Sequence, residues 1–215
     1  MIQLKIKQEI IRLVSAFRLK SFELHYVPKK YWDQWWKVKL DPVAPQIEVE
    51  TSLRNINSIM TRYECSNILE IGCGRAEIRD LPGYLGLDFS PTVLKNNDLP
   101  HFLYADITKR IPLPDKTFDA VLSRYVLLHV PFDRIEMAVK EMSRVAKKCI
   151  ILYETWSSNP EQNGTWCFKH NLPKLFSEHF DGALVLVKKD GAKEEIIYPS
   201  SSLEEYQMVH ITTRL

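Results

Sequence analysis

The stretch Asn67–Asp88, NILEIGCGRAEIRDLPGYLGLD, decides the fold of this 215-residue chain. It opens on Ile68–Ile71, a mainly apolar run between turn residues that predicts a short buried strand. Gly72-Cys73-Gly74 follows at once and predicts a sharp turn, because glycine permits positive backbone dihedrals and close approach of a ligand. A second apolar run, Tyr84–Leu87, ends on Asp88. Strand, glycine turn, short helix, strand and acid form the opening of a doubly wound nucleotide-binding fold, whose ligands lie at the carboxyl ends of the strands.

The glycine turn is compatible with two classes of cofactor. A dinucleotide requires G-x-G-x-x-G, with a pyrophosphate on the N-terminus of the following helix. The third glycine position is here Glu77, whose carboxylate would repel a pyrophosphate. A nucleoside cofactor without phosphate avoids this conflict. Glu70, Gly72 and Gly74 would then form its loop, and Asp88 would accept hydrogen bonds from the ribose hydroxyls.

The sequence resembles class I S-adenosylmethionine (SAM)-dependent methyltransferases of the type 11 kind, over roughly residues 67–187. Ala76 stands where that family often has a third glycine. Five blocks in the family's order carry the resemblance: Leu69–Gly74, Gly86–Ser90, Ala105-Asp106, Phe118–Ser123 and Glu141–Val145.

The resemblance implies an α/β fold with a doubly wound, mostly parallel, seven-stranded sheet, the Rossmann-like methyltransferase fold, whose last strand is antiparallel. The residue pattern predicts helices over 46–63, 131–146 and 172–180, a helix that Ser90 caps, and strands over 101–105, 118–123, 149–153, 184–187 and 207–212. Residues 195–198 either add a strand or belong to a loop. We expect an N-terminal helical appendage outside this fold.

The resemblance also implies a SAM site. Glu70 would lie near the amino group of the donor, Asp88 would bind the ribose, and Asp106 with the Ile107 amide would read the adenine. Each carboxylate could instead cap a turn or a helix. The cofactor-binding residues expected are Glu70, Gly72, Cys73, Gly74, Asp88, Phe89, Asp106, Ile107 and Ser123.

Methyl transfer is an in-line displacement that requires alignment of donor and acceptor but neither a nucleophilic residue nor a metal. Arg124 and His129 are the candidate catalytic residues. Arg124 could pair with the donor carboxylate or with an anionic substrate, and His129 could accept a proton from a hydroxyl acceptor. Surface exposure is the alternative for Arg124 and a structural role for His129. The candidate substrate-binding residues are Tyr31, Trp32, Trp35, Trp36, Glu154, Trp166 and His170. Glu154, Trp166 and His170 could instead simply pack the loop after the fifth predicted strand.

The N-terminal segment, residues 1–45, is predicted to be a helical and aromatic lid on a SAM-binding domain of residues 46–215. Residues 2–20 have the spacing of an amphipathic helix, which either packs on the domain or lies on an anionic membrane surface. Tyr31 and Trp32, Trp35 and Trp36 either cap the active site, meet a partner or pack in the core. We expect the segment to close over the sulfonium, because aromatic faces attract cations.

Composition argues against several classes of protein, among them metal-binding, disulfide-rich and membrane-spanning proteins. The net charge of +2 does not indicate a nucleic-acid binder, although a local patch could still bind RNA. The four cysteines lack C-x-x-C spacing, which argues against zinc and against a disulfide framework and favours a cytoplasmic location. No stretch of 18 uncharged apolar residues predicts a membrane span, and charges in the first twenty residues interrupt any signal peptide.

The sequence therefore predicts methyl transfer from SAM to a small-molecule, sugar or lipid-linked acceptor. An RNA or protein methyltransferase and a catalytically silent methyltransferase-like subunit are the alternatives. A nicotinamide-dependent oxidoreductase is disfavoured by Glu77. After the fourth predicted strand the chain reads Ser123-Arg124-Tyr125-Val126, without an Asn-Pro-Pro-Tyr-like motif, which argues against methylation of DNA bases and of protein glutamine. The oligomeric state is not predicted.

Overall fold

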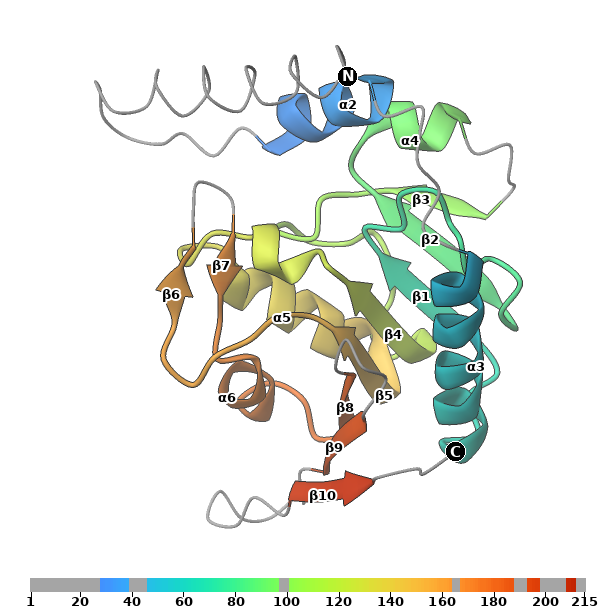
Figure 1. Ribbon diagram of the computed structural model, residues 1–215, viewed down its shortest axis with the longest axis vertical. Coiled ribbons are helices and arrows are strands. Elements are labelled where there is room, and N and C mark those ends of the chain that lie inside the picture. Colours follow the sequence, from blue (N-terminus) through green and yellow to red (C-terminus); the bar gives the residue numbers. More distant parts are fainter. Residues whose placement is uncertain are drawn as a thin grey trace.

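A central β-sheet with helices on both faces forms the body of the protein (Figure 1). The computed structural model describes residues 28–38, 46–96, 101–163, 167–187, 193–197 and 208–211. The strands of the central sheet are β1 (Ile68–Ile71), β2 (Tyr84–Asp88), β3 (Phe102–Tyr104), β4 (Phe118–Arg124), β5 (Ala146–Tyr153), β8 (Ala183–Val187), β9 (Lys193–Ile197) and β10 (Met208–Ile211). The helices are α2 (Pro28–Val38), α3 (Gln46–Arg62), α4 (Pro91–Asn96), the 3₁₀ helix η1 (Leu127–His129), α5 (Ile135–Val145) and α6 (Leu172–Ser177). β6 (Glu161–Gln162) and β7 (Phe168–Lys169) form a separate two-stranded sheet.

The order of the strands confirms the predicted fold class. Within the described residues the central sheet has eight strands, in the order β10-β9-β8-β5-β4-β1-β2-β3. Neighbours from β8 to β3 are all parallel, whereas β9 pairs antiparallel with both β8 and β10. The sheet has one strand more than the seven expected. The sequence left residues 195–198 open between strand and loop, and residues 193–197 pair with β8 along their whole length.

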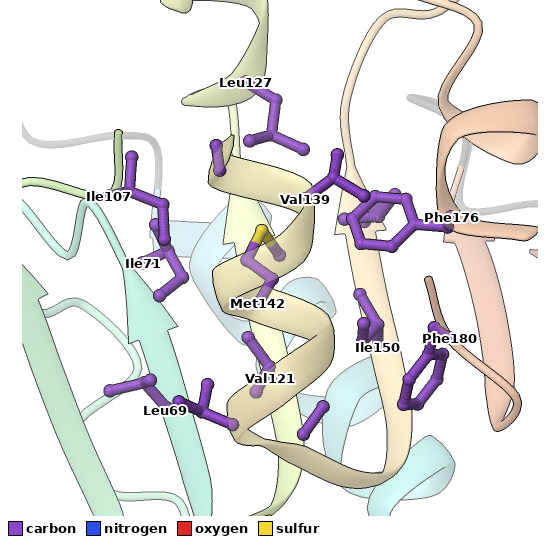
Figure 2. Close-up of a cluster of buried hydrophobic side chains, with 14 of the residues drawn as sticks. Leu69, Ile71, Ile107, Val121, Leu127, Val139, Met142, Ile150, Phe176 and Phe180 are labelled. Carbon is purple, nitrogen blue, oxygen red and sulfur yellow. The ribbon is translucent and has the colours of Figure 1, made fainter. Parts of the chain in front are cut away.

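α5 and α6 cover one face of the parallel strands. Figure 2 shows Val139 and Met142 of α5 against Leu69 of β1, Val121 of β4 and Ile150 of β5. All five side chains are completely buried. Burial on both faces explains why these strands read as nearly continuous apolar runs in the sequence.

α3 covers the opposite face of the sheet, and its presence confirms the helix predicted over residues 46–63. Ile56, Ile59 and Met60 of α3 are at most 4% exposed. They belong to a second core cluster that includes Ile68 of β1 and Ile151 of β5. Residue Ile151 lies on the face opposite to its neighbour Ile150, as the alternation of strand side chains requires. α3 is therefore part of the sheet domain itself.

The short helix predicted between Gly74 and Pro82 is wrong, because residues 75–83 form consecutive turns. Ala76 has a φ of +51°, and this left-handed conformation interrupts a right-handed helix two residues after Gly74. Pro82 and Gly83 then leave too few residues for a new helix. Residues 72–83 are all described and none is helical, so no helix dipole is directed at the glycine turn. A pyrophosphate would find no helix N-terminus there.

Two other predictions shift at their boundaries. α5 begins at Ile135 instead of residue 131, because Pro131–Arg134 forms a turn in which the Arg134 amide donates to the Pro131 carbonyl at 3.0 Å. β5 begins at Ala146, directly after α5. The amphipathic helix predicted for residues 2–20 lies outside the described residues.

Candidate active site

The glycine turn lies at the carboxyl end of β1, between β2 and β4, where the strand order reverses. Gly72 and Gly74 have φ values of +62° and +50°, which confirms the need for glycine predicted there. A Cβ at Gly72 would lie 2.4 Å from Cγ2 of Val126, and one at Gly74 would lie 2.8 Å from Cζ2 of Trp36. The sequence led us to expect the cofactor at Gly74. The structure places the Trp36 indole against it.

Asp88 joins the glycine turn to the next helix. Its Oδ2 accepts a hydrogen bond from the Gly74 amide at 3.1 Å, and its Oδ1 accepts one from the Ser90 amide at 2.9 Å. Burial raises the pKa of Asp88, and the backbone amides oppose that rise. Cys73 is also buried, and its amide donates to the Leu87 carbonyl at 3.0 Å. These bonds fix the distance between the turn and the end of β2.

Glu70 and Arg124 form the centre of a buried polar network on the α3 side of the sheet. Tyr84 donates its hydroxyl to Glu70 Oε2 at 2.6 Å, and Arg124 Nε donates to Glu70 Oε1 at 3.1 Å. Arg124 Nη2 also donates to Glu77 Oε2 at 3.3 Å. Burial raises the pKa of Glu70 despite the nearby Arg124 guanidinium. Burial opposes the charge of Arg124, but the two carboxylates raise its pKa above the ordinary value. The sequence suggested the donor carboxylate or an anionic substrate as the partner of Arg124, whereas the structure pairs it with Glu70 and Glu77.

Glu154 organises the segment that follows β4. Its Oε1 accepts hydrogen bonds from the Ser123 hydroxyl at 2.7 Å and from the Val126 and Leu127 amides at 2.8 and 3.1 Å. Its Oε2 accepts from the Leu128 amide at 3.3 Å. Burial raises the pKa of Glu154, and these four donors oppose the rise. The side chains of Ser123 and Glu154 are therefore directed at each other and at η1. Their predicted contacts with cofactor and substrate stay predictions.

α2 lies beside α4, beyond the carboxyl ends of the strands (Figure 1). The ring of Trp32 lies 4.7 Å from the ring of His129, centroid to centroid, at an interplanar angle of 59°. Trp36 contacts the glycine turn at Gly74. A further cluster of aromatic rings on the same helix consists of Tyr31, Trp32 and Trp35, with centroids 5.1 to 6.3 Å apart. The four predicted substrate-binding aromatics of the N-terminal segment thus belong to one helix, which covers both the turn and η1.

His170 takes a structural position. It is 1% exposed, and its Nε2 lies 2.8 Å from the Val130 carbonyl oxygen at the end of η1. Its ring packs against Phe132 and Phe168, with centroids 5.1 and 6.2 Å away. Burial lowers the pKa of His170. A ring enclosed in this way supports η1, which agrees with the packing role considered as its alternative, and contact of His170 with a substrate stays a prediction. Trp166 lies outside the described residues.

Asp106 lies on the rim of the site, after β3. Its Oδ1 accepts hydrogen bonds from the amide and the hydroxyl of Thr108, at 3.0 and 2.7 Å, which is the loop cap considered as its alternative role. Ile107 is buried and Phe89 is half-buried. Glu141 Oε2 accepts from the Ile111 amide at 2.7 Å and so anchors the loop that follows Asp106 to α5.

Comparisons with known proteins agree with this geometry. Residues 69–152 match the methyltransferase domain family. They include the glycine turn, Asp88, Asp106 and Ser123, and they end two residues before Glu154. This part of the chain is a SAM-dependent methyltransferase domain. No curated protein sequence matches it.

Solved structures similar to this methyltransferase are distant in sequence. The magnesium protoporphyrin IX methyltransferase of Synechocystis PCC 6803 with bound SAM is 14% identical, with a TM-score of 0.52 over 88% of this chain and 96% of that one. A Haloferax volcanii methyltransferase solved with the Trm112 methyltransferase activator is 16% identical, with a TM-score of 0.39 over 72% of this chain. A SAM-dependent methyltransferase of Archaeoglobus fulgidus is 22% identical, with a TM-score of 0.34 over 45% of this chain. The chain spans 58% of the length of the Haloferax protein and 49% of the Archaeoglobus protein. The Synechocystis match supports the fold of the methyltransferase and carries no information on its acceptor.

Sequence reasoning missed several residues of the methyltransferase site. Tyr125 has a φ of +55° and is 52% exposed at the carboxyl end of β4, and its amide donates to the Tyr153 carbonyl at 2.9 Å. A bulky residue in this conformation is an outlier of the kind found at functional sites. Nothing in the sequence reveals a positive φ outside glycine. The sequence predicted only that Tyr84 belongs to a strand, although its hydroxyl donates a hydrogen bond to Glu70.

The described part of the methyltransferase holds neither a candidate membrane span nor a candidate metal site. None of the helices found there is both long and apolar enough to cross a bilayer. The described residues also contain no group of three or more histidine, cysteine, aspartate or glutamate side chains arranged to hold a metal ion.

Proposed function

We propose that this methyltransferase acts on a small-molecule acceptor, including a sugar or a lipid-linked one, bound between η1 and the aromatic helix α2. The observation that carries the proposal is the contact between Trp32 and His129, whose ring centroids lie 4.7 Å apart. This contact places the aromatic side chains of α2 over η1, the segment that follows β4. An aromatic surface of this kind suits an acceptor with apolar surface that can be buried.

The charges near the turn also favour a small acceptor over a nucleic acid. Nucleic-acid binding requires unpaired cationic groups along a groove. The Arg124 guanidinium, at the centre of the site, is instead shared between the carboxylates of Glu70 and Glu77. RNA and protein acceptors, and a silent subunit that binds SAM without transfer, are the alternatives that the experiment below separates.

Each polar residue has a proposed task. Asp88 accepts hydrogen bonds from the ribose hydroxyls, Glu70 attracts the donor ammonium group, and Asp106 contacts the adenine edge. Arg124 acts as a positioning residue, because its Nε holds Glu70 Oε1 at 3.1 Å. His129 accepts the proton of a hydroxyl or amine acceptor. Residues 1–45 form the lid and residues 46–215 the catalytic domain, a division supported by α2, which lies over the site.

Incubation of the full chain with SAM labelled on its methyl group and a cell extract separated into small-molecule, lipid, RNA and protein fractions tests the proposal. We expect label in the small-molecule or lipid fraction, and loss of that label with His129→Ala. Label confined to the RNA or protein fraction would contradict the proposed acceptor class. SAM binding without label in any fraction would favour the silent subunit.

A further inference from the structure

α2 occupies the face of the glycine turn that a ligand needs. Cζ2 and Cη2 of Trp36 lie 2.8 and 2.9 Å from the position that a Cβ of Gly74 would take. Glycine opens this face to close approach because it lacks a side chain. The indole fills the opening, so Trp36 and a donor molecule cannot both lie against Gly74.

A polar latch holds α2 at this position. Oδ1 of Asp33 accepts hydrogen bonds from the Ser90 hydroxyl at 3.0 Å and from the Thr92 amide at 3.1 Å. The amide of the same Ser90 donates to Asp88 Oδ1 at 2.9 Å. Ser90 is completely buried. A single residue thus connects the latch on α2 to the carboxylate proposed to bind the ribose.

The rest of the contact between α2 and the domain is shallow. The side chains of residues 30–36, which include Asp33 and Trp36, are all exposed or half-buried. Neither hydrophobic core cluster contains a described residue of α2. Elements with few buried apolar contacts separate from a fold at a small cost in free energy. The latch is therefore one of the contacts that hold the docked helix, together with the contact between Trp32 and His129.

We infer that α2 is an autoinhibitory gate on the donor site. With α2 docked as observed, Trp36 blocks the glycine turn, and the donor binds after α2 has moved off it. α2 then returns over η1, with Trp36 displaced from Gly74, and completes the acceptor site of the proposed function. The inference rests on the donor site of the proposed function. A gate of this kind raises the apparent dissociation constant of the donor by the reciprocal of the open fraction. Weakening the latch increases the open fraction and so strengthens binding.

Titration of the full chain with S-adenosylhomocysteine, the demethylated form of the donor, tests the gate without turnover. Asp33→Ala removes the acceptor of both latch hydrogen bonds. We expect the dissociation constant of S-adenosylhomocysteine to be about tenfold lower for this variant than for the wild type. The reason is that two hydrogen bonds to a carboxylate are lost from the docked state alone. Asp181→Ala is the matched control, because the Asp181 side chain is 77% exposed and its ion pair, with Lys116 at 3.8 Å, lies outside α2. The dissociation constant of S-adenosylhomocysteine for this variant should equal that for the wild type.

Rapid mixing provides a second readout. If opening precedes binding, the observed rate of the tryptophan fluorescence change should level off at high ligand concentration in the wild type, and the plateau should be higher in Asp33→Ala. A rate that rises linearly with ligand concentration in both proteins, with equal dissociation constants, would overturn the gate while leaving the donor site intact.

Trp36→Ala distinguishes a gate from a wall of the donor site. A gate predicts tighter binding of S-adenosylhomocysteine by this variant, because the Gly74 face is opened. Weaker binding in a variant with an unchanged melting temperature would show that the indole contacts the donor, and the gate would be overturned. Failure of the wild type and of both variants to bind would instead overturn the donor site itself, and the gate with it.

Discussion

Asp88 meets two demands with one carboxylate. Its oxygens hold the amides of Gly74 and Ser90, and in the proposed function they also accept from the ribose. Each carboxylate oxygen can accept more than one hydrogen bond, so the two roles are compatible. The negative charge matters most for the ribose, because hydrogen bonds to ionised acceptors are about twice as strong as neutral ones.

We therefore predict that Asp88→Asn weakens SAM binding at least about tenfold, or about 1.4 kcal/mol. The amide retains one acceptor oxygen for the backbone and loses the charge. Calorimetric titration measures the effect, and a thermal melt establishes that the variant is folded. An unchanged dissociation constant in a folded variant would remove Asp88 from the donor site.

A second residue-scale prediction concerns the packing of the turn. Gly72→Ala should destabilise the fold by about 2–4 kcal/mol, because a left-handed φ is unfavourable for alanine and the new Cβ would meet Val126. Val126→Ala should remove the part of this destabilisation that comes from the contact between the new Cβ and Val126. Urea unfolding of both single variants and the double variant gives the coupling, which we expect to be about 1 kcal/mol. Strict additivity would mean that Val126 does not restrict position 72.

At the scale of elements, the run of turns over residues 75–83 takes the place of a helix. Without a helical ladder the run depends on side-chain contacts, and one of them is the ion pair between Glu77 and Arg124 of β4, at 3.3 Å. The same guanidinium offsets part of the free-energy cost of burying the Glu70 carboxylate. Arg124 thus connects the turn run, β1 and β4.

Arg124→Met should cost about 3 kcal/mol of stability, because it leaves a buried carboxylate without its charged partner. The loss should be larger at pH 8 than at pH 5. Burial raises the pKa of Glu70 above 4.5, so its contribution to stability is present below 4.5 and is lost as pH rises through the folded-state pKa. Removal of the guanidinium raises that pKa further. Denaturant unfolding across this range checks the prediction, and parallel pH profiles for variant and wild type would contradict it.

The elements also show what the sequence could reveal. The glycine turn, Asp88 and the strands were predictable because their residues are close together along the chain or repeat with a simple period. The partners of Arg124 and Asp33 were not, because Glu77 is 47 residues from Arg124 and Ser90 is 57 residues from Asp33. The prediction of a helix after Gly74 was wrong because nothing in the sequence indicates the positive φ of Ala76.

At the scale of the whole molecule, neither hydrophobic core cluster includes a described residue of α2. The two core clusters are built from α3, α5, α6, the sheet and the segments between them. This arrangement leaves α2 to act on the site without contributing to the core. The predicted division at residue 45 places α2 in the lid and α3 in the domain.

A chain that begins at Gln46 should therefore unfold cooperatively, bind S-adenosylhomocysteine more tightly than the full chain and lose turnover. Tighter binding follows from removal of the gate, and the lost turnover follows from removal of the aromatic side chains over His129. Circular dichroism, calorimetry and the labelled-methyl assay test the three parts. Aggregation of the shortened chain would indicate that residues 1–45 belong to the core, and full activity would exclude a role for them in transfer.

The crystal structure of the full chain with bound S-adenosylhomocysteine is the most direct test of the central claim, which is that the donor lies across the glycine turn. We predict ribose hydroxyls on Asp88, the donor against Gly74, and the Trp36 indole moved off that glycine. A ligand bound elsewhere, with Trp36 still packed on Gly74 and Asp88 bonded only to backbone amides, would contradict the account.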